Sequence, residues 1–585
     1  MVKIEINGTP LEVEAGTTII EASKKIEGLE IPALCYMNLG LFKLDHHVAS
    51  CRICMVEVTQ GQAKPRLMPS CAVPVAEGMK IVTNTPEIIN HRRNVLELLL
   101  SDHPFECLTC GKNLECELQT LAKKFNIHEV KYKGEQSTYP LDISSKAIKR
   151  DLNKCIMCRR CETMCNTVQT VGTLTGYGRG FTAVVGTAGL EPLKDTNCTF
   201  CGQCVSVCPT AALAEINYTK DVWSALANPK KTVVVQTAPA VRTSIGEEFG
   251  FAAGYDGTGK LVAGLKKMGF NAVFSTDFAA DLTIMEESKE LIDRIQSGKN
   301  LPILTSCCPG WVNFLEQQFP SLLNIPSTCK SPMQMSGAIT KSYYAQKIGI
   351  DPKDLVVVAI MPCLAKKYEA GREEFTKDGV SDVDYVLSVR ELAKMFREAG
   401  VNFAALPDAE FDNPLGEATG AGTIFATTGG VIEAALRTAY ETVTGQELKG
   451  SDIEFHAVRT AMEGVKEAVV DFNGLKLNIA ITNGLGNARK VLEKIEAGEA
   501  NYHAIEIMAC PGGCIGGGGQ PYIHGDTGKI EARRQGLYKI DGNDKLRKSH
   551  LNPSIQKLYK EFLGEPGGHK AHELLHTHYS DRSKG

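Results

Sequence analysis

The sequence lacks any apolar stretch long enough to cross a membrane, because a membrane helix needs about 18 consecutive apolar residues. The apolar run Leu355–Ile360 has only the length of a strand. The N-terminus shows no basic segment followed by an apolar core and no twin-arginine segment, so no export signal is expected. These absences predict a cytoplasmic protein that does not bind membranes.

The sequence also lacks a marked excess of either charge. Its 64 Lys and Arg residues and 68 Asp and Glu residues give a net charge of −4. Nucleic-acid-binding proteins usually carry a basic excess, so nucleic acid is not an expected partner.

A G-x-G-x-x-G motif between a strand and a helix is missing as well. We therefore expect this chain to bind neither flavin nor nicotinamide by itself.

Cysteine, in contrast, is abundant. The chain has 585 residues, enough for several domains, and 21 of them are cysteines. Disulfides are disfavoured in a reducing compartment, where clustered cysteines indicate metal binding or redox chemistry. Most of these cysteines recur at tight, repeated spacings, which isolated core cysteines do not do.

Residues 1–78 predict a small β-rich domain. Val2–Ile6 and Leu11–Val13 flank an Asn-Gly turn, which is a hairpin signal. Thr17–Ile26 has a helical pattern with Thr17 as the candidate cap. The cysteine spacing suits a [2Fe–2S] cluster on a β-grasp domain, although a four-cysteine zinc site stays possible from these residues alone. The four candidate ligands are Cys35, Cys51, Cys54 and Cys71.

Residues 79–118 combine one imidazole with three thiols after a helical pattern over Ile88–Leu100. This set could hold zinc or a [4Fe–4S] cluster, and the segment alone does not decide between them. The neighbouring iron–sulfur motifs favour iron. The candidate ligands are His103, Cys107, Cys110 and Cys116.

Residues 140–218 contain the strongest local signal, a C-x2-C-x2-C-x3-C run that occurs twice. It is the run of bacterial two-cluster ferredoxins, in which the fourth cysteine of each run binds the other cluster. Asn166 stands where proline is usual after the first run and leaves the ligands intact. One predicted [4Fe–4S] cluster has the ligands Cys155, Cys158, Cys161 and Cys208. The other has Cys198, Cys201, Cys204 and Cys165.

Residues 225–535 have an α/β pattern. Thr232–Gln236 and Leu355–Ile360 predict strands, whereas Val262–Met268 and Leu282–Ile295 predict helices. Strands that alternate with helices favour a parallel sheet covered by helices. Functional sites in such folds lie at strand ends.

Two cysteines of this α/β region, Cys510 and Cys514, lie four residues apart and are followed by Gly516–Gly519. Glycine lets the backbone approach a bulky group closely. Cys308 and Cys363 each follow an apolar run and are candidate partners. Four thiolates from three distant segments suit a large inorganic cofactor at a fold junction.

The tail, residues 536–585, is polar and helix-prone. Its histidines are expected to be scattered on the surface, and no metal is predicted there. They are His550, His569, His572, His576 and His578.

Three segments, Thr305–Trp311, Met361–Lys367 and Glu506–Gln520, closely resemble the signature segments of the [FeFe]-hydrogenases, in the same order. The resemblance covers essentially the whole chain, and the tail is similar to the small subunit of two-chain members. The long spacing between Cys35 and Cys51 looks more like the catalytic subunits of multi-subunit, NAD(P)-linked hydrogenases. The N-terminal part also resembles the iron–sulfur subunit of respiratory complex I.

The resemblance implies an H cluster, a [4Fe–4S] cluster on Cys308, Cys363, Cys510 and Cys514. Cys514 would bridge it to a diiron subsite that carries carbonyl, cyanide and a dithiolate. By the same resemblance, Lys366 donates to a cyanide. The implied pocket residues are Ala238, Pro239, Met361, Met508, Gly429 and Gly430. Met333 stands where family members commonly have glutamine, and Gln334 follows it.

The resemblance also implies a proton relay that starts at Cys307. Adjacent side chains on an extended segment point to opposite faces, so Cys307 can face the open iron if Cys308 faces the cluster. Glu287 and Glu290 are three residues apart on one predicted helix and share a face; a solvated helix face is the alternative for them. The implied relay is Cys307, Glu287, Ser327, Glu290 and Arg294. Cys329 is expected to be a small core residue.

The expected protein is thus a multidomain α+β enzyme that cleaves H2 reversibly and heterolytically into protons and electrons. One [2Fe–2S] and three [4Fe–4S] clusters would pass the electrons from the H cluster to flavin- and NAD(P)-binding or iron–sulfur partner subunits, in a hetero-oligomer. A single-chain hydrogenase that uses ferredoxin is an alternative. Others are a non-enzymatic iron–sulfur carrier or assembly factor, a complex-I-like electron-transfer subunit and a sensory hydrogenase.

Overall fold

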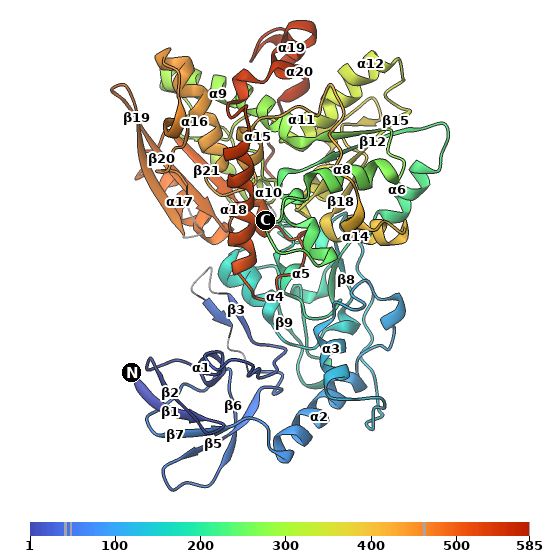
Figure 1. Cartoon of the computed structure of the whole chain (residues 1–585), viewed down its shortest axis with the longest axis vertical. Coiled ribbons are helices and arrows are strands. Elements are labelled where there is room, and N and C mark those ends of the chain that lie inside the picture. Colours follow the sequence, from blue (N-terminus) through green and yellow to red (C-terminus); the bar gives the residue numbers. More distant parts are fainter. Residues whose placement is uncertain (40–43, 47–48, 460–463, 584–585) are drawn as a thin grey trace.

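The computed structural model describes residues 1–39, 44–46, 49–459 and 464–583. The N-terminal sheet forms one end of the molecule and the large C-terminal α/β region the other, with the short elements β8, β9, α4 and α5 between them (Figure 1). Among the described residues no helix is long and apolar enough to cross a membrane.

The N-terminal sheet has five strands in the order β2-β1-β7-β5-β6. β1 and β2 form the predicted antiparallel hairpin, and β7 pairs with β1 in parallel. The predicted helix is shorter than expected and its cap differs: α1 spans Ile19–Ser23, and the hydroxyl of Thr18 accepts from the Glu21 amide. Thr17 is not the cap; its carbonyl accepts a hydrogen bond from the Val75 amide. The strands are Val2–Ile6, Thr9–Val13, Met55–Gln60, Arg66–Pro69 and Met79–Val82.

Two helices, α2 (Pro86–Ser101) and α3 (Glu117–Lys124), flank the loop that carries the predicted His/Cys ligands. Thr85 caps α2 and Pro86 opens it, which suits its fixed φ. The ferredoxin-like segment follows. Its strands β8 (Ile148–Arg150) and β11 (Leu213–Glu215) pair antiparallel, and its short helices are α4 (Arg160–Thr163) and α5 (Gln203–Val207).

The C-terminal region contains two four-stranded sheets. The first is parallel throughout, in the order β13-β12-β15-β18. Its strands are almost entirely buried, as expected for a parallel sheet covered by helices on both faces. Both predicted strands and both predicted helices of this region are present. The strands are Thr232–Thr237, Ala272–Ser275, Leu355–Met361 and Tyr385–Ser388; the predicted helices are α8 (Thr258–Lys267) and α9 (Thr276–Ser297).

The second sheet has the order β14-β21-β20-β19, with β14, β21 and β20 parallel. The helices that contact it include α16 (Gly430–Thr444) and α17 (Leu485–Glu496). The cysteine-containing segments begin where β14, β21 and the first sheet's β15 end. The ends of strands from both sheets therefore form the junction at which the candidate site lies. The strands are Ile303–Leu304, Val465–Phe472, Leu475–Asn483 and Ala504–Met508.

A buried ion-pair network fastens the tail to this region. Arg437 on α16 donates to Glu433 at 2.7 Å and to Asp541 of α18 (Gly528–Asn543) at 2.8 Å. All three side chains are fully buried. The pairing satisfies charges that would otherwise be costly to bury, so it fixes α18 against α16.

We predict that Arg437→Met destabilises the C-terminal region by about 3 kcal/mol, because it removes the fully buried partner of Glu433 and Asp541 and leaves them only the more exposed Arg459 and Arg547. The midpoint of its urea-induced unfolding measures this. Lys289→Met is the matched control: it removes the exposed Lys289–Asp293 pair, and we expect a change below about 1 kcal/mol. Equal effects of the two variants would contradict the structural role of Arg437.

Candidate metal and catalytic centre

The four N-terminal cysteines converge in a buried cluster. The Cys35 amide donates to the Cys51 sulfur at 3.4 Å, and all four side chains are buried. Hydrogen bonding from Cys71 outweighs burial and holds the pKa of Cys54 at about 6. Thiols that hydrogen-bond to one another are close enough to bind one metal centre together. The deprotonated sulfur is the form that binds a metal.

His103 is half-buried, and its buried Nδ1 has no hydrogen-bond partner in the described structure. Burial lowers the pKa of His103 to about 4, with a smaller contribution from Lys154, which keeps the imidazole neutral. Cys107 and Cys110 lie on and after a single 3₁₀ turn, and Cys116 caps α3. A neutral imidazole with a free nitrogen near three half-buried thiols is a competent metal ligand.

The two ferredoxin-type runs are interleaved as the spacing predicts. The pKa of Cys161 is raised by burial and then by Cys158 and Cys208, the last cysteine of the other run. Likewise, the pKa of Cys204 is raised by burial, then by Cys201 and Cys198 of the same run, and then by Cys165 of the other run. Each run thus places its fourth cysteine near the first three of the other.

Four more thiols meet at the junction of the two sheets. Burial, followed by Cys363 and Cys308, raises the pKa of Cys510 well above its usual value. Burial and Cys308 raise the pKa of Cys514 to about 12. The Cys308 sulfur accepts from the Ala509 amide at 3.4 Å. Like charges at this range repel, so deprotonating these thiols together requires a cationic group among them.

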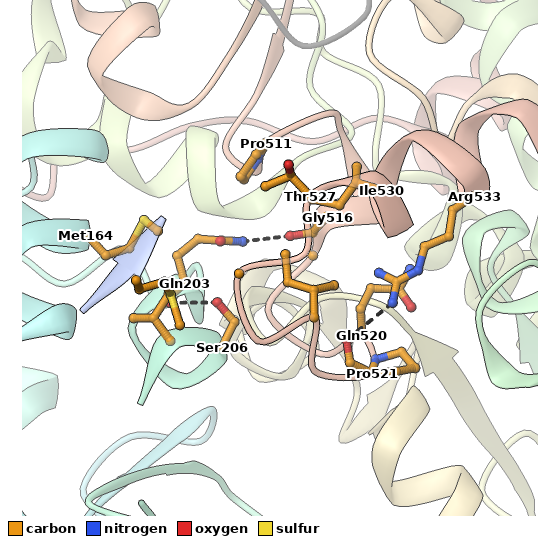
Figure 2. Close-up of a pocket in the computed structure, with 15 residues that line it drawn as sticks. Met164, Gln203, Ser206, Pro511, Gly516, Gln520, Pro521, Thr527, Ile530 and Arg533 are labelled. Atoms are coloured by element: carbon orange, nitrogen blue, oxygen red, sulfur yellow. Dashed lines mark hydrogen bonds between the residues drawn. The ribbon is translucent and has the colours of Figure 1, made fainter. Parts of the chain in front are cut away.

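The glycine-rich loop provides clearance at this junction. Gly513 has φ of +92°, and a side chain on Gly517 would meet the Pro362 carbonyl oxygen at 2.2 Å. Figure 2 shows the loop against the ferredoxin-like segment, where the Gln203 amide of α5 donates to the Gly516 carbonyl at 3.0 Å. A side chain on Gly518 would clash with the Gly202 backbone at 2.7 Å. The glycines therefore allow the ferredoxin-type thiols to approach the central ones. Burial above all raises the pKa of Cys201 to about 11, and Cys308 contributes a smaller part of the rise.

A cavity of about 60 Å³ adjoins the central thiols. Cys307 and Cys514 line it together, and Cys308 is not among its lining residues, as expected for opposite faces of the segment. The implied pocket residues Ala238, Pro239, Met361 and Lys366 also line it, whereas Met508, Gly429 and Gly430 do not. Sequence reasoning missed the lining residues Thr276, Ala280, Pro332, Pro362, Phe425 and Ala426.

The missed residues come from four separate segments and are mostly small or apolar. No local pattern distinguishes them from ordinary core residues, so spacing could not have identified them. Met333, which replaces the usual glutamine, lines the cavity.

The buried Lys366 is held beside Cys307. Its Nζ donates to the Cys307 carbonyl at 3.1 Å and to Glu369 at 2.8 Å. Burial lowers the pKa of Lys366, but the charge and hydrogen bond of Glu369, with smaller contributions from Cys363 and Cys307, together outweigh burial and leave the pKa above its usual value. The ammonium is therefore a fixed positive charge at the cavity.

The predicted relay residues are brought together from α9, from the loop after β14, which carries Cys307, and from the segment before α11 (Pro332–Ile339), which carries Ser327. The Ser327 hydroxyl donates to Glu290 at 2.9 Å, and Arg294 donates to Glu290 at 2.6 Å. Glu287 is buried, and its Oε1 has no partner among the described residues. Burial and then Glu290 raise the pKa of Glu287 to about 8. The pKa of Cys307 is raised by burial, then by Cys308 and Cys514, and then by the charge of Glu287. The alternative of a solvated helix face does not hold for Glu287.

The tail covers this relay, and the expectation of exposed histidines is wrong for His576 and His550. One His576 ring nitrogen is 3.0 Å from Glu286, and the other is 2.7 Å from the Thr328 hydroxyl. His550 pairs with Glu441. The backbone of His576 also bridges that of Cys329, a buried core residue. The tail thus seals the far side of the relay.

We predict that Glu287 is protonated at neutral pH and loses its proton as the pH rises through about 8. Difference infrared spectroscopy should show a carboxyl C=O band that disappears over this range and is missing from Glu287→Gln. The exposed carboxyl of Glu12 supplies the control, because Glu12→Gln should leave the band unchanged. Loss of the band near the usual glutamate pKa of 4.5 would contradict the burial argument.

Comparison with protein families yields five matches along the chain. The profile described as iron only hydrogenase large subunit, C-terminal domain, matches residues 231–518, and iron hydrogenase small subunit matches 527–582. A 2Fe-2S iron-sulfur cluster binding domain matches 1–86, and a 4Fe-4S binding domain matches 194–214. The NADH-ubiquinone oxidoreductase-G iron-sulfur binding region matches 92–131.

Individual relatives match over the full length. The NADP-reducing hydrogenase subunit HndD of Solidesulfovibrio fructosivorans is 56% identical to this chain, and the match covers 100% of both proteins. Iron hydrogenase 1 of Clostridium pasteurianum is 40% identical over 99% of this chain and 100% of its own. A solved structure of [FeFe]-hydrogenase HydA1 from Chlamydomonas reinhardtii is 44% identical with a TM-score of 0.56, covering 63% of this chain and 100% of that one. The chain therefore belongs to the iron-only, or [FeFe]-, hydrogenase family.

Proposed function

We propose that this chain is the catalytic subunit of an enzyme that cleaves H2 reversibly and heterolytically into protons and electrons. The observation that carries the proposal is the meeting of four thiols, three of them buried and that of Cys514 half-buried, beside a small cavity that Cys307 and Lys366 also line. A plain electron carrier needs the thiols but neither a cavity nor a buried acid–base path beside them.

The residues present fit the expected set of clusters. The N-terminal thiols fit one [2Fe–2S] cluster, and the five-stranded mixed sheet with its hairpin fits a β-grasp domain. The free nitrogen of His103 fits a His/Cys3-bound [4Fe–4S] cluster, and the interleaved runs fit two more. The thiols of Cys308, Cys363, Cys510 and Cys514 would hold the cubane of an H cluster, and Cys514, which lines the cavity, would lie beside its diiron subsite.

When bound, the diiron subsite supplies the Lewis acid that polarises H2. The protein then has to hold the anionic ligands of the subsite, exclude water and remove a proton. Lys366 provides a buried positive charge that can donate to cyanide. The largely apolar cavity lining keeps water out, which strengthens that interaction.

The proton leaves through the chain's own side chains. The Cys307 thiol is the group of the relay that lines the cavity. Its high pKa keeps it protonated, so it can give up one proton only as it accepts another. Glu287, with a pKa near 8, can accept a proton at neutral pH only by passing its own to the Ser327–Glu290 pair. Arg294 orients Glu290 at the end of the path.

The thiol sets form a series along the molecule. Cys201, of the second ferredoxin-type run, lies close to the central site. Cys158, of the first run, lies in the same apolar cluster as Cys35 of the N-terminal set. Lys112, from the His/Cys3 loop, donates to the carbonyl of Cys208. Clusters held at these positions would conduct single electrons between the central site and two surface branches. The name of the relative HndD indicates an NADP-reducing complex, so we propose a hetero-oligomer with flavin- and NAD(P)-binding or iron–sulfur subunits.

Two alternatives differ from this proposal in measurable ways. A single-chain, ferredoxin-dependent hydrogenase would be fully active as an isolated monomer, whereas a multi-subunit enzyme should co-purify with flavin-containing subunits. A non-enzymatic carrier or assembly factor would show neither H2 oxidation nor infrared bands of bound carbon monoxide and cyanide. The chain with its H cluster assembled is expected to show those bands and to reduce methyl viologen with H2. Absence of both would overturn the proposed function.

We predict that Cys307→Ala loses more than about 99% of H2 oxidation, because it removes the proton-transferring group that faces the cavity. Iron content and infrared bands should stay at the level of the unmodified chain. Cys329→Ala is the matched control for losing a buried thiol beside the relay, since Cys329 lies near Glu290 but does not line the cavity and is not one of the proposed ligands. Near-normal turnover in Cys307→Ala would refute the relay.

A further inference from the structure

Three metal-ligating side chains converge away from the proposed cluster sites. A carboxylate oxygen of Glu290, the sulfur of Cys329 and a ring nitrogen of His576 all lie within 4.8 Å of one another. They come from α9, from the segment before α11 and from the end of α20 (His569–Leu575). A thiol, an imidazole and a carboxylate are ligands that zinc prefers, whereas magnesium and calcium take oxygen ligands. The spacing of the tail histidines could not predict this group, because the other two side chains come from distant segments.

The backbone fixes the thiol and the imidazole next to each other. Cys329 and His576 face one another in an antiparallel bridge. Two backbone hydrogen bonds of 2.7 Å, between the residues on either side of the pair, flank it. The side chains of a pair flanked in this way lie on the same face and approach more closely than those of a hydrogen-bonded pair. The two ligands are therefore brought together before any metal binds.

Glu286 orients the ring of His576. Its carboxylate lies 3.0 Å from Nε2 and also accepts from the Tyr559 hydroxyl and from the Gly567 amide. An ionised carboxylate only accepts hydrogen bonds, so Nε2 carries the hydrogen and Nδ1 keeps its lone pair. That nitrogen accepts from the Thr328 hydroxyl at 2.7 Å. A carboxylate behind the imidazole is the usual outer partner of a zinc-bound histidine.

The carboxylate of Glu290 is held beside this pair. It accepts from the Thr328 amide at 3.1 Å, from the Ser327 hydroxyl at 2.9 Å and from Arg294 at 2.6 Å. A carboxylate has about four lone-pair sites, so it can also bind a metal while it keeps these partners. The Glu290 side chain is 15% exposed, more than that of His576 at 6%. An ion can therefore enter from the side of Glu290.

A divalent cation would balance the charge of this group. Cys329 is buried, and the charges of Glu290 and Glu287 disfavour its thiolate. The two positive charges of Zn²⁺ equal the charges of one carboxylate and one thiolate. When zinc binds, the zinc–sulfur bond forms, the S–H bond of Cys329 breaks and the proton goes to water.

We propose that Glu290, Cys329 and His576 form a zinc site with water as the fourth ligand, and that zinc bound there closes the proton exit. Zinc bonds of about 2.0–2.3 Å in a tetrahedron put the ligand atoms about 3.3–3.6 Å apart, so the three side chains have to close by about 1 Å. The site rests on the geometry alone. Its effect on turnover rests on the proposed function, in which Glu290 passes the proton on from Ser327.

The test uses the full chain with its clusters assembled and Zn²⁺ alone as the probe. Equilibrium dialysis gives the number of zinc ions and their affinity, and X-ray absorption at the zinc edge gives their ligands without interference from iron. We expect one zinc per chain, with one sulfur at about 2.3 Å and nitrogen or oxygen ligands at about 2.0 Å. Two or more sulfur ligands would place the zinc in one of the cysteine sets and overturn the site.

Two variants each remove one ligand. Cys329→Ala and His576→Gln should each weaken zinc binding more than about tenfold, because the loss of an outer partner alone costs that much. His569→Gln and His578→Gln remove exposed histidines of the same tail and are the matched controls. The glutamine amide of His576→Gln can still donate to Glu286, so this variant stays informative if Cys329→Ala disturbs folding. Unchanged zinc affinity in the test variants, or an equal loss in the controls, would overturn the site.

Zinc should also inhibit H2 oxidation, and an excess of chelator should restore it. The zinc concentration for half inhibition should rise more than about tenfold in both test variants, each compared with its own zinc-free rate. Zinc binding is measured without H2, so a chain that never oxidises H2 would overturn the proposed function and leave the binding result readable. Zinc bound by the expected ligands without inhibition of an active chain would overturn the closing of the proton exit.

Discussion

Mutual repulsion among the four central thiols is the constraint on which the rest of the structure depends. Cys308, Cys363 and Cys510 are buried and Cys514 is half-buried beside them. Burial raises the pKa of all four, and neighbouring thiols raise it further for Cys363, Cys510 and Cys514. They can act as thiolates only around a cationic core, so the fold must present them to a cluster and leave space for it. Placing them at strand ends of two different sheets meets both needs.

The remaining parts of the molecule supply what a buried centre lacks, namely routes to the surface. Helix α9 and the loop containing Ser327 form a buried acid–base path, and the tail closes it through His576 and Tyr579, whose hydroxyl donates to the Ser327 carbonyl at 2.5 Å. On the other side, the glycines of the loop after β21 bring the ferredoxin-like segment close. In the proposed function, protons and electrons would therefore travel along separate paths.

Much of the site could be predicted because its chemistry is encoded in short spacings. The C-x2-C-x2-C-x3-C runs predicted the exchange of Cys165 and Cys208 between two sites, and the mutual influence of the thiols agrees with it. The helix that places Glu287 and Glu290 on one face was also predicted and is longer than expected. Local errors were small: the cap of the first helix is Thr18, one residue after the predicted position.

The sequence by itself determined the thiol sets, the order of the domains and the family resemblance, because ligand spacing and strand periodicity are local properties. Only the tertiary structure decided which distant groups meet. Thr276 and Phe425 reach the cavity, and His576 reaches Glu286. These contacts join residues up to 290 positions apart. They depend on how sheets and helices pack, and no pattern within one segment reports that packing.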